Sequence, residues 1–298
     1  MNRRTFCKGI GIVSGAAASG VVTPKTVFAA KTDNREIDRL LNEGARFFYC
    51  GAHPDDEALV GSILAKAGPA LGNPVYFLVM THGDGGACHL PEGCHPTLAD
   101  LRHKELTEVC ANYRATLQNE RFFNAPLPVS SFPKRHEIAK IWKEQKDPTM
   151  VCAEAIRKFR PDVILTFDPD HGFTGHPEHQ LASRFVVQGA MVAADSKTQI
   201  GDLKPHNTPN IYYVLNKYWL MAIAGSRDPA TVTHTWNPLQ MCGHRLNCRD
   251  LMAEYTKSHR TQSADMGMVR ATRFLIDTVY LHKVDPAKEA KDPFEPVA

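Results

Sequence analysis

The sequence lacks long hydrophobic runs, internal repeats and, outside its first thirty residues, any excess of positive charge. Those thirty residues contain four of the 35 lysines and arginines and none of the 32 acidic residues, which leaves 31 basic against 32 acidic residues, a balance of −1. Without a basic excess, neither nucleic acid nor an anionic membrane surface is an expected partner. We expect a small molecule or a glycan instead.

The sequence also lacks the Cys-x-x-Cys spacing that is typical of structural zinc sites. It has eight cysteines, and the seven outside the first thirty residues are an odd number, so at least one is expected to stay unpaired. Two pairs are close enough to close small loops: Cys88 with Cys94, and Cys242 with Cys248. We expect disulfides or free thiols. The alternative for the first pair is a second metal site with the ligands Cys88, His89, Cys94 and His95.

Residues 1–30, "MNRRTFCKGIGIVSGAAASGVVTPKTVFAA", have the composition of an export signal. Their apolar stretch is too short and too rich in glycine to span a bilayer stably, and small residues near position 29 offer a cleavage site. The "RRTFCK" core resembles a twin-arginine signal, which implies the twin-arginine export machinery as a partner and a periplasmic or secreted protein. An ordinary basic tail is the alternative. Residues 31–298 are expected to form one catalytic domain.

Apolar runs alternate with helical patterns along most of the chain, which predicts a Rossmann-like, doubly wound α/β fold with a mostly parallel sheet and helices on both faces. Strands are expected over 46–52, 74–80, 121–126, 161–169 and 207–215. Helices are expected over 57–68, 98–115, 150–160, 176–194 and 248–262. Residues 228–243 are expected to be loop with possible edge strands, and residues 291–298 a loose tail.

Two charged clusters follow predicted strands. "AHPDDE" at 52–57 comes after the first strand, and "DPDHGFTGHPEHQ" at 168–180 comes after "VILTF". Because open α/β sheets bind ligands beyond the carboxyl ends of their strands, we expect the two clusters to meet in one crevice.

The spacing within each cluster is typical of a metal site. His53 and Asp56 are three residues apart across a turn that contains Pro54, and His176 and His179 are three apart at the start of a helix. Catalytic zinc usually has three protein ligands and leaves its fourth position to water.

We therefore expect His53, Asp56 and His179 to be the ligands, and Asp55 to be the general base that takes a proton from the water. His176 is expected to stabilise the oxyanion that forms when a carbonyl is attacked.

Two other interpretations of these residues exist. Two histidines and a carboxylate also bind the Fe(II) of oxygenases, but an oxygenase has no evident use for a flanking base and an oxyanion donor, which favours hydrolysis. Alternatively, Asp55 or Asp56 only caps the following helix, and "GHPEH" is a helix start with surface histidines. The occurrence of both clusters directly after apolar strands favours the functional interpretation.

"AHPDDE" and "TGHPEH" together resemble the PIG-L or LmbE-like family of zinc-dependent de-N-acetylases. The resemblance implies the same roles for His53, Asp55, Asp56, His176 and His179. Weaker likenesses lie in "THGDGG" at 81–86, "LRHKEL" at 101–106 and "SHRTQ" at 258–262, so that the resemblance extends over about residues 45–265.

The resemblance also implies that Arg102 lies near the substrate sugar, where it could hold a hydroxyl or an anionic group. A simple helix pair with Glu105 is the alternative. The chain departs from the family at Glu178, where aspartate is usual, and we expect this change to have a small effect. The insert "ACHLPEGCHP" at 87–96 and the stretch over 203–245 match no family motif.

These observations predict a zinc-dependent hydrolase, with Fe2+ as a possible metal, that removes the acetyl group from an N-acetylated amino sugar or glycoconjugate. Two rival functions are a metal-dependent amidase that cleaves a different acyl or peptide-like bond, and a non-catalytic glycan-binding relative. The presence of all five proposed site residues argues against the non-catalytic function.

Overall fold

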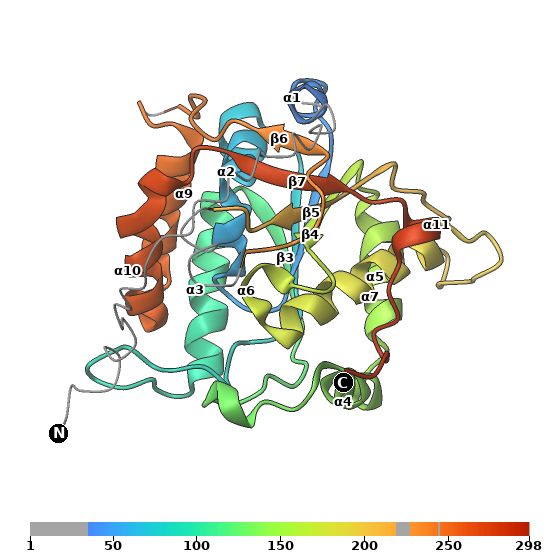
Figure 1. The fold of residues 1–298 in the computed structure, drawn as a ribbon, viewed down its shortest axis with the longest axis horizontal. Helices are drawn as coiled ribbons and strands as arrows, with labels where there is room; N and C mark the ends of the chain where they lie inside the picture. The colour runs from blue at the N-terminus through green and yellow to red at the C-terminus, as the bar shows by residue number, and fades with distance from the viewer. Residues whose placement is uncertain (1–34, 219–226, 244, 298) are drawn as a thin grey trace, which may run out of the picture. The chain divides into compact units, whose positions relative to one another are not determined.

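The computed structural model describes residues 35–218, 227–243 and 245–297 (Figure 1). The predicted export signal lies outside the described residues. A seven-stranded sheet has the strand order β3-β2-β1-β4-β5-β7-β6. Its strands are β1 Phe47–Gly51, β2 Val75–Val79, β3 Ala115–Asn119, β4 Val163–Phe167, β5 Asn210–Leu215, β6 His234–Trp236 and β7 Val279–Lys283. The first five strands pair in parallel and the last two antiparallel, which confirms the predicted mostly parallel α/β sheet.

Helices cover both faces of this sheet because successive side chains of each strand point to opposite faces. Phe47 and Tyr49 of β1 belong to one hydrophobic cluster, and Phe48 and Cys50 belong to the other. The first face is covered by α1 Glu36–Asn42, α2 Gly61–Ala65, α3 Leu98–Asn112 and α9 Cys248–Tyr255. The second face is covered by α4 Arg135–Gln145, α5 Pro148–Phe159 and α7 Pro177–Ala194 (Figure 1).

The remaining helices are short or lie near the edge of the sheet: α6 Gly172–Gly175, α10 Ser263–Thr272 and α11 Pro286–Glu289. Among the described residues, none of the helices combines the length and the apolar character needed to cross a bilayer.

The strand order reverses between β1 and β4, which are neighbours in the sheet although more than 100 residues separate them in sequence. In doubly wound sheets a crevice opens at such a point, beyond the carboxyl ends of the strands. Both charged clusters leave the sheet there, as the sequence predicts.

The strand predicted over 121–126 is wrong. The strand is β3, Ala115–Asn119, a half-buried edge strand whose polar residues conceal its pattern. The apolar residues of 121–126 instead pack below the end of the sheet, where Phe122 stacks on Trp142 with ring centroids 5.3 Å apart. This segment leads Asn124 and Ala125 toward the crevice.

Several helices differ from prediction. The helix predicted over 57–68 consists of a 3-10 turn at Asp56–Leu59, helix α2 and a π turn at Lys66–Ala70 that contains Pro69. The helix predicted over 248–262 ends at Tyr255 and continues as 3-10 turns. The other predicted helices form with ends shifted by up to three residues, whereas α1, α4 and α10 were not predicted.

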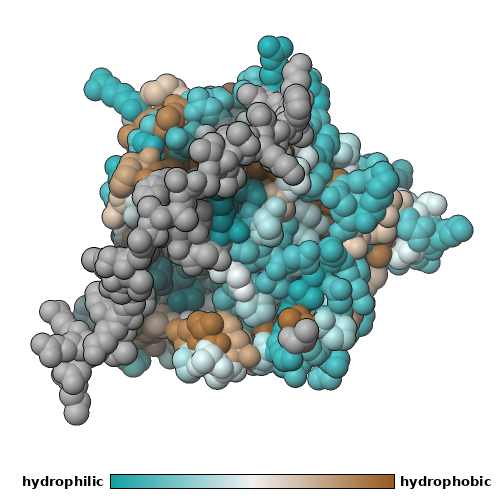
Figure 2. Space-filling model, viewed as in Figure 1, coloured by the Kyte–Doolittle hydropathy of each residue, from teal (hydrophilic) through white to brown (hydrophobic). Residues whose placement is uncertain are grey.

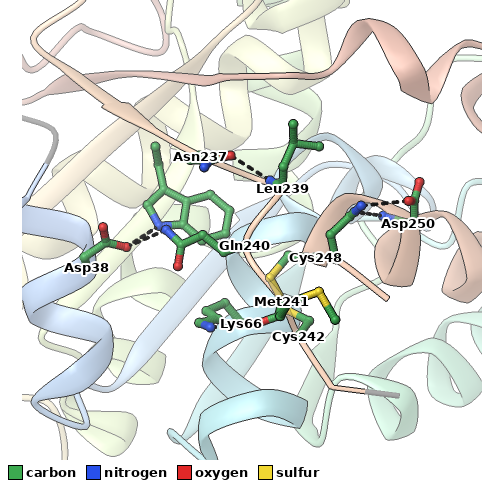
Figure 3. The surroundings of a disulfide bond; sticks show 11 residues. Asp38, Lys66, Asn237, Leu239, Gln240, Met241, Cys242, Cys248 and Asp250 are labelled. Carbon is green, nitrogen blue, oxygen red and sulfur yellow. Dashed lines mark hydrogen bonds between the residues drawn. A yellow bond between two sulfur atoms is a disulfide. The ribbon is translucent and has the colours of Figure 1, made fainter. Parts of the chain in front are cut away.

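The cysteines pair as disulfides Cys88–Cys94 and Cys242–Cys248, which excludes Cys88 and Cys94 as thiolate ligands of a second metal. Three buried cysteines remain unpaired: Cys50, Cys110 and Cys152. Figure 3 shows the Cys242–Cys248 disulfide beside the segment that holds Gln240. The Asp38 carboxylate of α1 accepts hydrogen bonds from the side chains of Gln240 and Trp236, so this loop is tied to the body of the domain.

The C-terminal segment is not a loose tail. The guanidinium of Arg184, whose side chain is buried, donates to the Asp292 carbonyl at 2.6 Å and to the Glu295 carboxylate at 2.9 Å. Pro293 is buried. A buried guanidinium needs acceptors, and the tail supplies two of them, which is a reason for its order that composition does not reveal.

Candidate active site and metal centre

The first charged cluster leaves β1 in a tight turn whose side chains point in different directions. Asp55 has φ = 110°, a conformation that non-glycine residues adopt rarely and that is often found at functional sites. Its neighbour Asp56 turns back toward the strand, and one carboxylate oxygen, Oδ2, accepts hydrogen bonds from the backbone N–H groups of Ala52 and His53. The two adjacent aspartates therefore point in different directions.

The second cluster runs from the end of β4 through the short helix α6 to the start of α7. His176 is the N-cap residue, and Nδ1 of its ring accepts a hydrogen bond from the backbone N–H of Glu178 at 3.2 Å. An Nδ1 that accepts a hydrogen bond carries no proton, so the proton of the neutral ring is on Nε2. Burial, followed by the charges of His53 and His179, lowers the pKa of His176 to about 2. At neutral pH His176 is therefore an uncharged hydrogen-bond donor.

The potential metal-binding atoms of the two clusters converge. His179 Nε2 lies 2.9 Å from Asp56 Oδ1 and 3.1 Å from His53 Nδ1, and His53 Nδ1 lies 3.4 Å from Asp56 Oδ2. His53, His176 and His179 also offer ring nitrogens that all lie within 4.8 Å of one another. The structure thus brings the three predicted ligands together and adds His176 as a further candidate.

The other ring nitrogens of His53 and His179 are held in place, as is usual for metal-binding histidines. His53 Nε2 lies 2.5 Å from a Glu178 carboxylate oxygen. His179 Nδ1 lies 2.9 Å from the carbonyl oxygen of Gly172 and 3.1 Å from the Thr174 hydroxyl. This leaves His53 Nδ1 and His179 Nε2 directed at the common point. Imidazole and carboxylate donors in this arrangement fit zinc or Fe2+.

Glu178 is more important in the structure than the sequence indicates. Its side chain is fully buried, and besides His53 it contacts the Asn124 amide at 2.7 Å and the Ala125 backbone N–H at 2.6 Å. A glutamate at this position is expected to have little effect because it is not one of the predicted metal ligands. The carboxylate instead links His53 to the segment that follows β3, a contact that local spacing could not reveal.

The predicted base, Asp55, lies beside a second buried group. The side-chain amide of Gln262 donates to Asp55 Oδ2 and also to the Pro54 carbonyl, the latter at 3.0 Å. Burial and repulsion from Asp56 raise the pKa of Asp55 to about 7, against the opposing charges of His259, Arg102 and His53. A carboxylate with a pKa near neutrality suits proton transfer.

Two buried carboxylates hold this region in place through hydrogen bonds. Glu57 accepts from the backbone N–H of Asp55 at 3.0 Å and lies 2.6 Å from His259 Nε2. Glu105 accepts from the backbone N–H and hydroxyl of Thr261 at 2.9 and 2.7 Å. The segments 101–106 and 258–262, which carried the weaker family likenesses, thus meet beside the base.

Arg102 lies in the wall of the same cavity. Its side chain forms no ion pair with a described residue, since both oxygens of Glu105 accept from Thr261, so the simple helix pair is absent. The guanidinium donates to the Ala87 carbonyl at 3.1 Å, and its Nε is buried without a partner among the described residues. A Cβ on Gly86 would lie 2.7 Å from two guanidinium nitrogens, which explains the glycine there.

These residues surround a cavity of about 500 Å³, a volume typical of small-molecule sites. The polar side chains named above meet apolar ones at its mouth: Leu59, Leu127, Phe132, Met266 and Val269. On the face drawn in Figure 2, hydrophilic residues cover most of the surface that is not grey, and hydrophobic residues form separate groups. The cavity can therefore accept a polar ligand that carries some apolar surface.

The chain is similar in sequence to known proteins. Residues 49–190 match the family model described as GlcNAc-PI de-N-acetylase, PIG-L. A 1D-myo-inositol 2-acetamido-2-deoxy-alpha-D-glucopyranoside deacetylase of Thermomonospora curvata is 31% identical over 198 residues, which cover 61% of this chain and 65% of that protein. The protein of the same description from Kineococcus radiotolerans is 27% identical over 235 residues, 68% of this chain and 63% of that protein.

Solved structures share the fold. A conserved protein of Thermus thermophilus has a TM-score of 0.54 at 18% identity, covering 81% of this chain and 95% of its own. An N,N'-diacetylchitobiose deacetylase of Pyrococcus horikoshii has a TM-score of 0.53 at 15% identity, covering 88% and 93%. The chain spans less than two thirds of the length of the two sequence relatives. Over residues 49–190 the chain is thus similar to the PIG-L family, and it is similar to these relatives over the shares given above.

Proposed function

We propose that this protein is a metal-dependent de-N-acetylase that hydrolyses the acetamide of an N-acetylated amino sugar or glycoconjugate. The observation that carries the proposal is the convergence of His53, Asp56 and His179 on one point, with Asp55 and His176 lining the same cavity. The two sequence relatives are described as deacetylases of an N-acetylated sugar, which supports the same substrate class.

The proposed ligands are His53, Asp56 and His179, and the proposed metal is zinc, with Fe2+ as the alternative. When bound, the metal would polarise the amide carbonyl and lower the pKa of the attacking water. The chain itself contributes the orientation of the ligands. Glu178 holds the ring of His53, and the Gly172 carbonyl holds the ring of His179.

Asp55 is the proposed general base. Its Oδ2 is engaged by Gln262, which fixes the carboxylate beside the cavity. Asp55 accepts a proton from the attacking water and returns it to the amine nitrogen as the C–N bond breaks, so acetate and a free amine leave. With its pKa raised to about 7, the Asp55 carboxylate is suited to accept and return a proton near neutral pH.

His176 is the proposed oxyanion stabiliser. Because Glu178 N–H donates to its Nδ1, the neutral ring presents Nε2–H as a donor. A donor that is already oriented stabilises the negative charge that develops on the carbonyl oxygen without needing to reorganise. His176 therefore acts here as an uncharged hydrogen-bond donor.

The test is an assay of acetate and free amine released from N-acetylglucosamine and N,N'-diacetylchitobiose by protein loaded with zinc. The same assay is repeated with Asp55→Ala and after chelation. Release that depends on both Asp55 and the metal supports the proposal, and unchanged rates in both controls refute it. Donors with longer acyl groups test the alternative amidase: faster amine formation from these than from the acetyl compounds would favour it.

We also propose that residues 1–30 direct export by the twin-arginine route, which would let the metal be loaded before transport. The motif "RRTFCK" supports this proposal. The test is fractionation of cells that express the full chain, with N-terminal sequencing of the product. Recovery of the intact chain from the cytoplasm alone would contradict it.

A further inference from the structure

We propose that the loop closed by the Cys88–Cys94 disulfide is a substrate-recognition wall, and that His89 within it is a specificity-determining residue that contacts the sugar. This inference rests on the proposed function, because it concerns how the deacetylase holds the part of its substrate beyond the acetamide. The loop belongs to the insert over 87–96, which matches no motif of the family.

His89 is placed to meet a ligand. It lines the cavity together with Gly85, Gly86 and Ala87, and the residues that would bind the metal line the same cavity. Nδ1 of its half-buried ring is itself buried and has no hydrogen-bond partner among the described residues, which leaves Nε2 as the ring nitrogen that can meet a ligand. An imidazole can donate one hydrogen bond and accept another, so an unpaired ring in a cavity wall is suited to a sugar hydroxyl.

Two hydrogen bonds to the backbone of the loop, one from another backbone segment and one from a side chain, hold the start of the loop against the cavity. The backbone N–H of His89 donates to the Thr261 carbonyl at 2.9 Å, and the Ala87 carbonyl accepts from the Arg102 guanidinium at 3.1 Å. Cys88 lies between these two anchor points. The disulfide therefore connects the far end of the loop to the segment that these two hydrogen bonds hold in place.

The same anchor connects the wall to the proposed base. Thr261 is held by Glu105 and is followed directly by Gln262, whose amide donates to Asp55. A sugar that rests against His89 is thus positioned relative to the group that moves the proton. A contact of this kind lies away from the reacting bond, so we expect it to contribute to substrate binding and not to the chemical step.

The disulfide limits the conformations of the insert. Cys88 is exposed, and the loop to Cys94 projects from the surface before Thr97 caps helix α3. An exposed connection of this length would otherwise sample many conformations, and only some of them would keep His89 at the cavity. The bond between Cys88 and Cys94 removes most of that freedom.

The first test compares His89→Ala with His95→Ala, a change in the same insert at an exposed histidine that does not line the cavity. Loss of one hydrogen bond to the sugar should raise KM for N-acetylglucosamine about threefold to tenfold in His89→Ala. We expect kcat to stay within about twofold because the reacting groups are untouched. His95→Ala should leave both constants unchanged, and His89→Gln should recover part of the KM.

The second test removes the disulfide. Cys88→Ser with Cys94→Ser should raise KM in the same direction as His89→Ala, whereas Cys242→Ser with Cys248→Ser should leave KM unchanged in the protein that remains folded. Thermal unfolding of each variant shows whether the fold is kept. Equilibrium binding of N,N'-diacetylchitobiose to these variants in an Asp55→Asn background, which lacks the base, reports recognition separately from turnover.

The outcomes separate the two proposals. If the unsubstituted protein releases acetate and His89→Ala changes neither KM nor the dissociation constant, the inference about the loop is wrong and the proposed function stands. A loss of kcat with an unchanged KM would also overturn it, because His89 would then act on the reaction and not on recognition. If no N-acetylated sugar is bound or deacetylated by the unsubstituted protein, the proposed function and this inference both fail.

Discussion

The floor and the rim of the cavity are built in different ways. The cavity floor, defined as His53, Asp55, Asp56, His176 and His179, leaves the carboxyl ends of β1 and β4 and is held by buried side chains. The cavity rim, defined as residues 85–96, consists of half-buried and exposed residues and is held by backbone hydrogen bonds and one disulfide.

This difference separates two tasks within one site. The floor is placed by the order of the strands, so its geometry depends on the packed core of the domain. The rim is a loop on the surface of that scaffold, where sequence can change without disturbing the core. We therefore expect substitutions in the floor to affect the reaction or the metal, and substitutions in the rim to affect the substrate.

The largest effect should come from the base in the floor. Asp55→Asn keeps the shape of the side chain but removes its ability to accept a proton, so kcat/KM for acetate release should fall by about 10²- to 10⁴-fold. The matched control is Asp84→Asn, an exposed aspartate just before the rim that does not line the cavity. A fall of less than tenfold in Asp55→Asn would show that another group takes the proton.

The contact between His259 and Glu57, which lies beside the cavity floor, should stabilise the fold in a pH-dependent way. Burial alone would lower the pKa of His259, but the charge and hydrogen bond of Glu57 raise it above the ordinary value of 6.5. Because the folded protein binds this proton more tightly than the unfolded chain, the stabilisation is fully present below about pH 6.5 and is lost as the pH rises through the folded pKa.

His259→Gln should accordingly lower the free energy of unfolding by about 1.5–3 kcal/mol at pH 6, the range for a hydrogen bond to a charged group. The cost should be smaller at pH 9. Urea unfolding of both proteins at the two pH values measures the difference, and an equal cost at both would mean that His259 is neutral in the fold.

A substitution of Glu178 tests whether the cavity floor depends on residues that are not metal ligands. Glu178→Ala removes the acceptor at His53 Nε2 and leaves Asn124 without its partner. The affinity for zinc should fall by about 10- to 100-fold, the usual effect of removing a carboxylate that orients a metal-binding histidine. Competition with a zinc chelator measures this affinity directly. Glu137→Ala, on the exposed start of α4, is a control that should leave it unchanged.

The smallest contrast concerns the two disulfides, which have the same sequence separation of 6. In a chain-entropy description, loop closure contributes the same amount to each, about 2 kcal/mol. Cys242 and Cys248 are almost fully buried, whereas Cys88 is exposed, so serine in place of the buried pair adds the cost of unpaired hydroxyls. Removal of Cys242–Cys248 should lower the unfolding temperature more than removal of Cys88–Cys94, and the reverse order would contradict this account.

The local sequence pattern predicted an element correctly where a single short segment determines it. The apolar runs before "AHPDDE" and "DPDHGF" predict strands, and the observed β1 and β4 lie there. The local pattern failed where a strand is only partly buried, or where a segment is held by a residue distant in the sequence. The polar edge strand β3 was misplaced, and the tail that Arg184 orders was expected to be loose.

The sequence by itself determined the alternation of strands and helices, the two charged clusters and the five residues proposed for the chemistry, since these depend on neighbours a few positions apart. Only the tertiary structure decided which side chains hold that group in place: Glu178 on His53, Gln262 on Asp55 and His259 on Glu57, pairs that are 125, 207 and 202 residues apart. The physical reason is that a buried polar group takes its partner from whichever segment the sheet order brings beside it, and spacing along the chain does not record that order.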